Sequence, residues 1–312
     1  MTTKKQKIWQ ILLIGLAVLC FVLLFVGGPG PDSSRSFTYG WGLGHLFSFA
    51  LWTYLYLQWR TPQPSLRLVG EVLLLAFLLG AGTELLQSEI GRDASWQDLM
   101  NDLLGSMLAL TFIIPGRTKS FSRTLWLVRI PLLALVGWTL IPFLSVTLDD
   151  LVAWQQFPLL SGFETPLETS RWGGNSRRRI DHQHVFSGSS SLRVELNTQR
   201  YSGVTLKHFP ADWSGYRRLR FWIFNPAAEP FPFYFRIHDQ AHRLSGNRYS
   251  DRYNTSLVAP PGWSRQEILL SKVAKAPRGR PMDMTKIAGL VLFVGKLKQP
   301  HTLYLDQVEL LP

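Results

Sequence analysis

Cysteine is almost absent from this chain of 312 residues, in which Cys20 is the only one. No intramolecular disulfide can form, so cysteine content does not indicate a redox compartment. The sequence also lacks the G-x-S-x-G, P-loop, H-E-x-x-H and C-x-x-C motifs, each of which marks a particular catalytic or metal chemistry. It has no nucleic-acid-binding motif either, so we expect no nucleic acid partner.

Charge is scarce as well, because charged residues make up 17% of the chain and apolar residues 46%. The apolar residues concentrate before about residue 148, and strand-like alternation follows. Residues 1–150 carry 11 basic and 9 acidic side chains, whereas residues 151–312 carry 22 and 12. The second part therefore holds +10 of the net +12, which favours anionic surroundings such as phospholipid headgroups or acidic envelope polymers.

Five apolar stretches are long enough to cross a bilayer, and we expect spans at residues 8–26, 39–58, 68–86, 99–115 and 125–146. A cleavable signal peptide is the alternative for the first stretch. That stretch is longer than is usual for a signal peptide, and no A-x-A pattern follows it. Lys and Arg are enriched in alternate loops, eight against two. This bias predicts a cytoplasmic N-terminus and an extracytoplasmic location for everything after Val146.

Polar side chains lie at the outer ends of three of these spans, where lipid would favour apolar ones. The candidate membrane site consists of His45, Glu84, Gln87, Arg92, Asp98 and Asn101. Ionisable groups at membrane depth are costly unless paired or hydrated, and they mark functional sites. The alternative is that these residues only hold the bundle together, with Asp98 as a helix cap and Glu84–Arg92 as an ion pair.

The spacing of this polar set resembles that of the VanZ-like family of bacterial membrane proteins. The family pattern is an early His, then E-x-x-Q, an Arg and D-x-x-N-x-x-x-G, which read here as His45, Glu84–Gln87, Arg92 and Asp98–Asn101–Gly105. The resemblance covers about residues 40–115. It implies a helical domain over residues 1–147 in the bacterial inner membrane, with membrane lipids as partners, and it implies no particular reaction.

A linker is expected at residues 148–159, after which short alternating segments are separated by turn clusters. About eight strands are expected over residues 160–312, which is typical of an antiparallel sandwich. The segments are SLRVELN, GVTLKHF, LRFWIFN, PFYFRIHD, SLVAP, QEILL, AGLVLFVG and TLYLDQVEL. The expected fold is therefore an α-helical multi-pass membrane bundle followed by an all-β sandwich.

The sandwich region resembles the galactose-binding-like jelly rolls of carbohydrate-binding modules. The carrying stretches are GFETP, DWSGYRRLRFWIFNP, FRIHD, the PPGW turn and LYLDQVEL. The resemblance implies a glycan partner and a structural calcium ion, held by acids near the first strand and in the last one. Glu164 and Asp306 match those places. Two carboxylates supply only part of a calcium shell, so two unrelated surface acids are the alternative.

The segment FPFYFRIHD alternates cleanly, which places Tyr234, Arg236 and His238 together on the face away from the core. Polar groups beside aromatic rings suit a sugar, because rings stack on its C–H face. The candidate glycan-binding residues are Tyr234, Arg236, His238, Asp239, Arg252 and Asn254. The alternative is that the polar groups are only solvated. We expect the nearby Trp222 and Phe224 to belong to the core.

Three functions remain open from the sequence. In the first, the protein binds a lipid-linked or lipid-like group at the outer leaflet and a glycan through its sandwich. In the second, it is a membrane enzyme acting on a lipid-linked envelope substrate, with Glu84 or His45 as acid or base and Arg92 gripping phosphate. In the third, it is a structural anchor. Binding is favoured over catalysis, because no recognised nucleophile–base arrangement is present.

Overall fold

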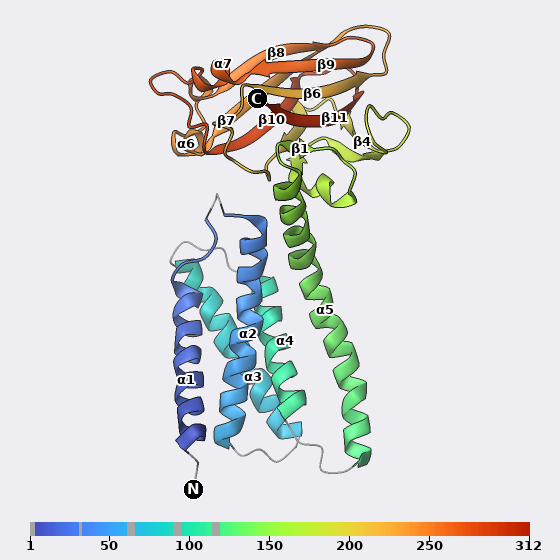
Figure 1. The fold of residues 1–312 in the computed structure, drawn as a ribbon. Coiled ribbons are helices and arrows are strands. Elements are labelled where there is room, and N and C mark those ends of the chain that lie inside the picture. The colour runs from blue at the N-terminus through green and yellow to red at the C-terminus, as the bar shows by residue number, and fades with distance from the viewer. Residues whose placement is uncertain (1–3, 31–32, 61–65, 90–94, 114–118) are drawn as a thin grey trace. The chain divides into compact units, whose positions relative to one another are not determined.

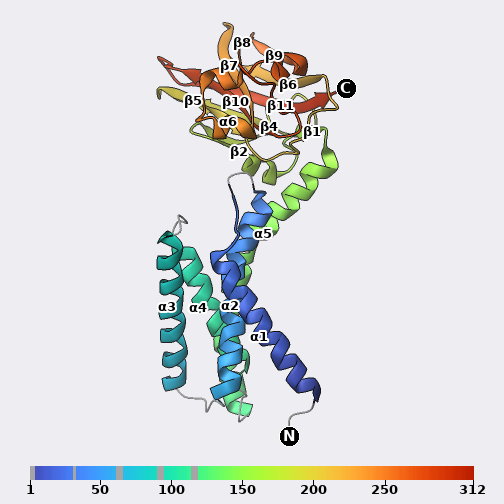
Figure 2. The same ribbon diagram turned by 90° about the vertical axis from the view of Figure 1, so that its left-hand side faces the viewer.

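The structure is a computed structural model that describes residues 4–30, 33–60, 66–89, 95–113 and 119–312. The chain divides into two compact units, residues 1–144 and residues 145–312. Five long helices occur in the described ranges: α1 (Lys4–Phe25), α2 (Arg35–Arg60), α3 (Leu66–Glu89), α4 (Trp96–Ile113) and α5 (Lys119–Gln156). Helix α4 packs against both α2 and α3, and α1 packs against α2 (Figures 1 and 2).

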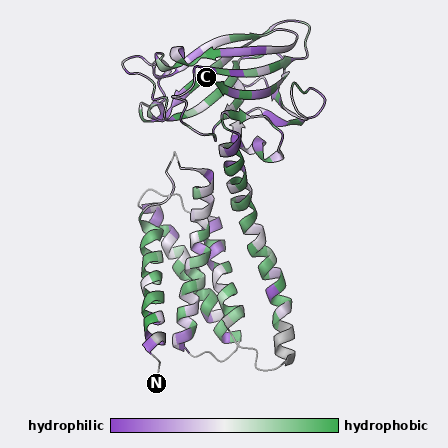
Figure 3. Ribbon diagram, viewed as in Figure 1, coloured by the Kyte–Doolittle hydropathy of each residue, from purple (hydrophilic) through white to green (hydrophobic). Residues whose placement is uncertain are grey.

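Three helices are long and apolar enough to cross a membrane among the residues that the structure describes. They are Gln6–Phe25, Leu66–Glu89 and Leu125–Gln156. Helix α1 is hydrophobic along almost all of its length in Figure 3. The other two expected spans are helical, but α2 carries Ser, Thr, Gly and His, and α4 opens with the polar sequence WQDLMND. Five membrane crossings therefore stay a prediction, while a helical region with three apolar helices is shown.

Glycines allow the helices around α4 to approach closely. A Cβ on Gly105 of α4 would lie 2.1 Å from the Leu46 carbonyl oxygen of α2, so only glycine fits there. On the other side, a Cβ on Gly80 of α3 would lie 2.6 Å from Asp102 Oδ2. Small residues are the usual means by which apolar helices pack backbone to backbone. The two contacts bring polar side chains of α2, α3 and α4 together.

Helix α5 continues to Gln156 and therefore runs through most of the expected linker at residues 148–159. Its last turns, TLDDLVAWQQ, contain neither glycine nor proline, and the first proline after them is Pro158. The extension also has a structural role in the second unit. Asp149 is buried there against Arg171, which follows the first short strand.

The second unit is a β-sandwich of two antiparallel sheets. Sheet A has the strand order β3 (Arg177–Asp181), β4 (Ser191–Leu196), β11 (His301–Leu311), β6 (Arg218–Asn225) and β9 (Gly262–Leu269), with β1 (Leu159–Ser161) also pairing with β11. Sheet B has the order β2 (Trp172–Gly174), β5 (Tyr201–Leu206), β10 (Ile287–Gly295), β7 (Phe231–Asp239) and β8 (Tyr253–Ala259). All eight strands expected from alternation are present, so the predicted sandwich is confirmed.

The two sheets bury a common apolar core, which explains why alternation predicted the strands so well. Leu219, Phe221 and Ile223 of β6 face Phe235 and its neighbours of β7, and Phe221 stacks on Phe235 at 4.9 Å. Short helical segments connect the strands: η1 (Pro166–Arg171), α6 (Gln240–Leu244), η2 (Tyr249–Asp251) and α7 (Leu270–Ala274). Inward residues alternate with outward ones, so each sheet has an outer face on which a ligand can be bound.

Candidate functional site

The outer face of sheet B brings together five of the six predicted glycan-binding residues. On β7, Tyr234 pairs in register with Ser256 of β8, and Arg236 pairs with Asn254. Arg252 immediately precedes β8. On the other side of β7, His238 lies opposite Gly289 of β10. A Cβ on Gly289 would lie 2.5 Å from His238 Cε1, so this glycine leaves room for the imidazole on the face.

An aromatic surface continues from these polar residues across the sheet. Tyr234 is 51% exposed and stacks on Phe293 of β10, with the ring centroids 5.4 Å apart. Tyr201 of β5 contacts Phe293 in an edge-to-face arrangement, with the ring centroids 6.3 Å apart. Three rings thus lie side by side on three adjacent strands. Exposed rings in this arrangement offer flat apolar surface next to hydrogen-bonding groups.

Buried polar atoms without hydrogen-bond partners gather on this same face. Among the described residues they include Arg236 Nε, His238 Nδ1, both ring nitrogens of His242, Arg252 Nε and Asn254 Oδ1. Buried polar groups are hydrogen-bonded in the great majority of cases, and each exception needs an explanation. A ligand with several polar groups could form hydrogen bonds with these clustered, unpartnered atoms.

The electrostatics of the face favour an anion. Burial, followed by repulsion from Arg252, lowers the pKa of Arg236 to about 10. Burial, followed by the positive charge of Arg236, lowers the pKa of His238 to about 3. The lowered pKa values of both groups indicate a partly desolvated site that already holds excess positive charge. In the part of the chain that the structure describes, neither Arg236 nor Arg252 has a carboxylate partner within salt-bridge distance.

Asp239, the sixth predicted residue, does not lie on the face. Its side chain is fully buried, and Arg280 donates to both carboxylate oxygens at 2.5 and 2.8 Å. The backbone amides of Asp283 and His242 donate to the same carboxylate. Although burial acts to raise its pKa, these hydrogen bonds hold the pKa of Asp239 below its ordinary value. Both carboxylate oxygens are thus occupied by partners inside the chain, contrary to the expectation that Asp239 accepts sugar hydroxyls.

The ion cluster around Arg280 positions the neighbouring site residues instead. Arg280 also donates to Asp251 at 2.7 and 2.9 Å, so one guanidinium joins the end of β7 to η2. His242 of α6 lies three residues after Asp239, and Arg252 comes directly after Asp251. Because both acids are already paired with Arg280, they do not neutralise the arginines on the face.

The loop 182–190 packs over part of the outer face of sheet A. Phe186 of this loop stacks on Trp222 at 3.6 Å, and His184 lies 5.0 Å from the ring of Phe224. The expectation that Trp222 and Phe224 belong to the core is therefore wrong. The alternation of β6 turns them outward, and aromatic side chains of the loop cover them. Phe186 is itself 40% exposed, and Trp222 and Phe224 are partly buried, so aromatic rings reach the surface on sheet A as well as on sheet B.

The predicted calcium ligands, Glu164 and Asp306, both contact this loop. Asp306 is fully buried, and its carboxylate accepts the backbone amides of Phe186, Ser187 and Gln307. Glu164 accepts the amide and hydroxyl of Ser189. Burial, with a smaller contribution from the negative charge of Glu164, raises the pKa of Asp306 to about 6. All four carboxylate oxygens of Glu164 and Asp306 accept hydrogen bonds from the chain, and a calcium ion between them stays a prediction.

The helical unit brings together most of the predicted membrane site. Ligating atoms of His45, Glu84 and Asp98 lie within 4.8 Å of one another. Asn101 Nδ2 donates to the Gly42 carbonyl of α2 at 3.1 Å. Gln87 turns away and donates to the Leu24 carbonyl at 2.7 Å, which ties α3 to α1.

Arg92 lies outside the described residues. Asp102, which was not among the predicted site residues, is fully buried and accepts a hydrogen bond from His45 Nδ1 at 3.0 Å. Its position four residues after Asp98 on the same helix was the sequence signal that could have identified it.

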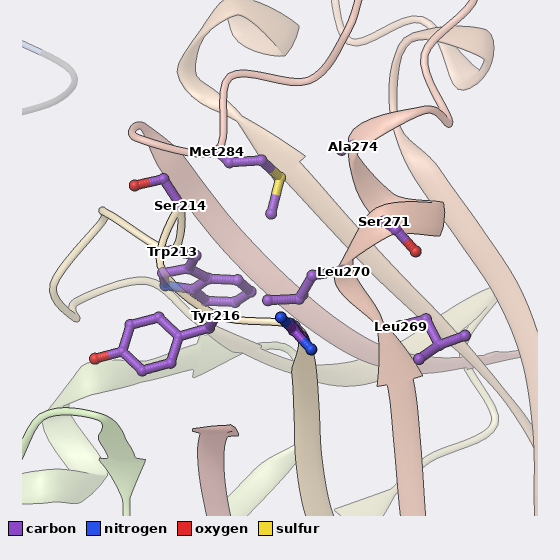
Figure 4. Close-up of a pocket in the computed structure, with 9 residues that line it drawn as sticks. Trp213, Ser214, Tyr216, Leu269, Leu270, Ser271, Ala274 and Met284 are labelled. Atoms are coloured by element: carbon purple, nitrogen blue, oxygen red, sulfur yellow. The ribbon is translucent and has the colours of Figure 1, made fainter. Parts of the chain in front are cut away.

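A pocket of about 560 Å³ lies elsewhere on the sandwich and shares no residue with sheet B's outer face. It is lined by Trp213, Ser214, Tyr216, Arg217, Leu269, Leu270, Ser271, Ala274 and Met284, most of which Figure 4 shows around an apolar hollow. Its lining is mainly apolar, and Arg217 is its only charged lining residue among those described. Its chemistry does not match a polar ligand, so we do not place the glycan there.

Comparison with known proteins gives matches to solved structures only, since no family model and no curated protein matches the chain. A family 11 carbohydrate-binding module from Clostridium thermocellum, in complex with a β-1,3-1,4-mixed-linked tetrasaccharide, is 17% identical with a TM-score of 0.40, over 49% of this chain and 94% of that chain. An exo-β-agarase is 20% identical with a TM-score of 0.40, over 49% of this chain and 24% of that chain. The family 30 module of a Clostridium thermocellum cellulosomal cellulase is 19% identical with a TM-score of 0.36. The match covers 45% of this chain and 90% of that chain.

These matches lie over the C-terminal part of the chain. At such TM-scores they carry no functional argument, and the function proposed below rests on this chain's own side chains. The resemblance to VanZ-like proteins has no support from a family model and stays a prediction.

Proposed function

We propose that the protein binds an acidic glycan of the bacterial envelope on the outer face of sheet B. The observation that carries the proposal is the pair Arg236 and Arg252, whose buried Nε atoms have no hydrogen-bond partner among the described residues. Arg236 lies two residues after the exposed Tyr234 on β7, and the Arg252 guanidinium lies 5.1 Å from the centre of the Tyr249 ring. Guanidinium groups bind carboxylate, sulfate or phosphate in a bidentate manner, while the ring supplies a stacking surface for a sugar.

Charge decides between an acidic and a neutral glycan. Placing two arginines close together in a partly desolvated site costs free energy, because burial and the charge of Arg252 both lower the pKa of Arg236. A negative group between them removes that repulsion, whereas a neutral hydroxyl does not. The +10 balance of residues 151–312 adds long-range attraction for polyanions. An acidic saccharide therefore fits the site better than a neutral one.

The helical unit extends the proposal to the membrane. Three apolar helices and the Lys/Arg bias of the loops support an envelope location with the sandwich on the extracytoplasmic side. The convergence of His45, Glu84 and Asp98 supports binding of the polar end of a lipid-linked or lipid-like group there. Calcium, bound through Glu164 and Asp306, would hold the loop 182–190 in place without contacting the glycan.

The test is a binding measurement with the full-length protein in a detergent that has no sugar headgroup. Oligosaccharides bearing uronate, sulfate or phosphate groups are compared with neutral ones of equal length at low and high salt. We expect acidic oligosaccharides to bind, with affinity that falls as salt rises. Arg236→Ala should weaken binding by about 10–100-fold, the loss expected for one charged hydrogen-bonding partner.

Arg265→Ala is the matched control, because it removes the same charge from β9 of sheet A, where Arg265 lies 3.5 Å from Glu267. Its affinity should equal that of the unmodified protein. Tyr234→Ala should weaken binding at both salt concentrations, since stacking is not screened. Equal affinities for Arg236→Ala and Arg265→Ala would place the site elsewhere, and no binding to any glycan would favour a structural anchor.

A further inference from the structure

Three helices of the first unit hold the cluster that the proposed function assigns to the polar end of a lipid-linked or lipid-like group, and its side chains are also of metal-ligating types. His45 comes from α2, Glu84 from α3, and Asp98 and Asp102 from α4. His45 is 2% exposed, Glu84 is 7% exposed and Asp102 is fully buried. Three carboxylates and one imidazole in an apolar bundle carry a net negative charge, and buried charge is unstable unless it is compensated.

The hydrogen bonds of the cluster prepare His45 to coordinate a cation. Because Asp102 Oδ1 accepts from His45 Nδ1 at 3.0 Å, the proton stays on Nδ1 and the Nε2 lone pair is left free. Nε2 lies 4.0 Å from Asp98 Oδ2, in the direction of the remaining carboxylates. A carboxylate behind the non-coordinating nitrogen is the usual arrangement for a metal-binding histidine.

A second observation, independent of the clustering, comes from Glu84. One of its oxygens accepts the amide of Ser95 at 2.5 Å, but Oε1 is buried and has no partner among the described residues. Asp102 Oδ2, which the missing side chain of Gly80 accommodates, is likewise buried and unpartnered. Buried carboxylate oxygens that no donor reaches are the groups that a cation would satisfy.

We propose that His45, Glu84 and Asp98 bind one divalent transition-metal ion, with Asp102 as the residue that orients His45. One imidazole nitrogen with two carboxylate oxygens suits zinc or manganese, whereas calcium and magnesium prefer oxygen ligands alone. Ligand atoms about 2.1 Å from zinc in tetrahedral geometry are about 3.4 Å apart. The three ligating atoms lie within 4.8 Å of one another, so small side-chain rotations bring them to coordination distance. The proposal does not depend on glycan binding.

The test uses the full-length protein in detergent, with any affinity tag removed and metals stripped by a chelator. Zinc is titrated calorimetrically in the presence of excess calcium, which occupies any site at Glu164 and Asp306. We expect one zinc ion per chain. Cobalt in place of zinc should give the visible absorption of a tetrahedral or five-coordinate nitrogen and oxygen site.

Variants separate a ligand from a positioning residue. His45→Gln and Asp98→Asn should each weaken zinc binding by more than about 100-fold, and Asp102→Asn by about 10–100-fold. Because His45 is buried and its variant can fail to fold, Asp98→Asn is the decisive one, since that side chain is 24% exposed. Glu71→Gln, which removes a carboxylate that pairs with Arg60 at the other end of α3, is the control and should bind zinc normally. No zinc binding by the unmodified protein, or unchanged binding by a folded Asp98→Asn variant, would overturn the proposal.

Discussion

Replacing Arg171 by methionine is expected to destabilise the sandwich by about 3–5 kcal/mol, the usual cost of breaking a buried ion pair from one side. Arg171 is 0% exposed and donates to Asp149 through Nε and Nη2 at 2.8–3.0 Å. Its Nη1 donates to the Leu160 carbonyl, and Glu168 lies 3.9 Å away. The variant would leave two buried carboxylates without their shared cation.

Chemical unfolding of the full-length protein, followed by tryptophan fluorescence, measures this effect. The 12 tryptophans include Trp172, which is adjacent to Arg171, and Trp213, and both are buried in the sandwich core. Arg171→Met combined with Asp149→Leu should be less destabilised than Arg171→Met alone, because the double variant removes one uncompensated charge. Arg179→Met, which breaks an exposed pair with Glu195, should cost no more than about 1 kcal/mol. If Arg171→Met and Arg179→Met were equally stable, Arg171 would not organise the sandwich.

The second large effect is a pH-dependent loss of stability at Asp306 that calcium should reverse. The pKa of Asp306 is about 6 in the folded chain, against an ordinary value of 3.8. The folded state therefore binds the proton more tightly than the unfolded state. Protonation of the Asp306 carboxyl group therefore contributes to the free energy of unfolding. This contribution is complete below pH 3.8 and is lost as the pH rises to about 6. Each pKa unit corresponds to 1.36 kcal/mol, so the loss is about 3 kcal/mol.

Thermal unfolding with a chelator, compared between the unmodified protein and Asp306→Asn across this pH range, isolates the effect. The comparison removes contributions from other groups, including His238, whose lowered pKa acts in the opposite direction as the pH falls below 6.5. At pH 7 we expect calcium to raise the melting temperature, since the ion relieves the repulsion between Asp306 and Glu164. Asp306→Asn should not respond to calcium. A melting temperature insensitive to both calcium and chelator would contradict calcium binding through Glu164 and Asp306.

Alternation predicted the strands because the sandwich buries one face of each strand, and a period of two is visible in a single sequence. The short strands β1, β2 and β3 were not predicted, since LLS and WGG are only three residues long and RRRID has no apolar alternation. The same alternation placed Tyr234, Arg236 and His238 on one face correctly. On β6 the segment FWIF is apolar on both faces, so Trp222 was expected in the core, whereas it points outward and Phe186 of a distant loop stacks on its ring.

Asp239 shows why the rest of the candidate site could not be read from the sequence. Its position at a strand end suggested a ligand contact, yet its partner Arg280 is 41 residues further along the chain in a loop without periodicity. Arg171 and Asp149 gave no signal for the same reason, since they meet across 22 residues and neither belongs to a motif. Pairings between distant residues depend on the tertiary fold, which local patterns do not encode.

Histidine resonances give the most direct test of where the glycan binds. The chain has 7 histidines, of which His238 and His242 lie at the proposed face, whereas His182 and His184 lie on the loop that covers sheet A. The imidazole signals of isotope-labelled full-length protein are assigned with His238→Gln and His242→Gln and then followed during titration with an acidic oligosaccharide. We predict that the signals of His238 and His242 shift, because a bound anion offsets the positive charge of Arg236, while those of His182 and His184 stay in place. Saturating oligosaccharide that leaves His238 and His242 unmoved would contradict the account.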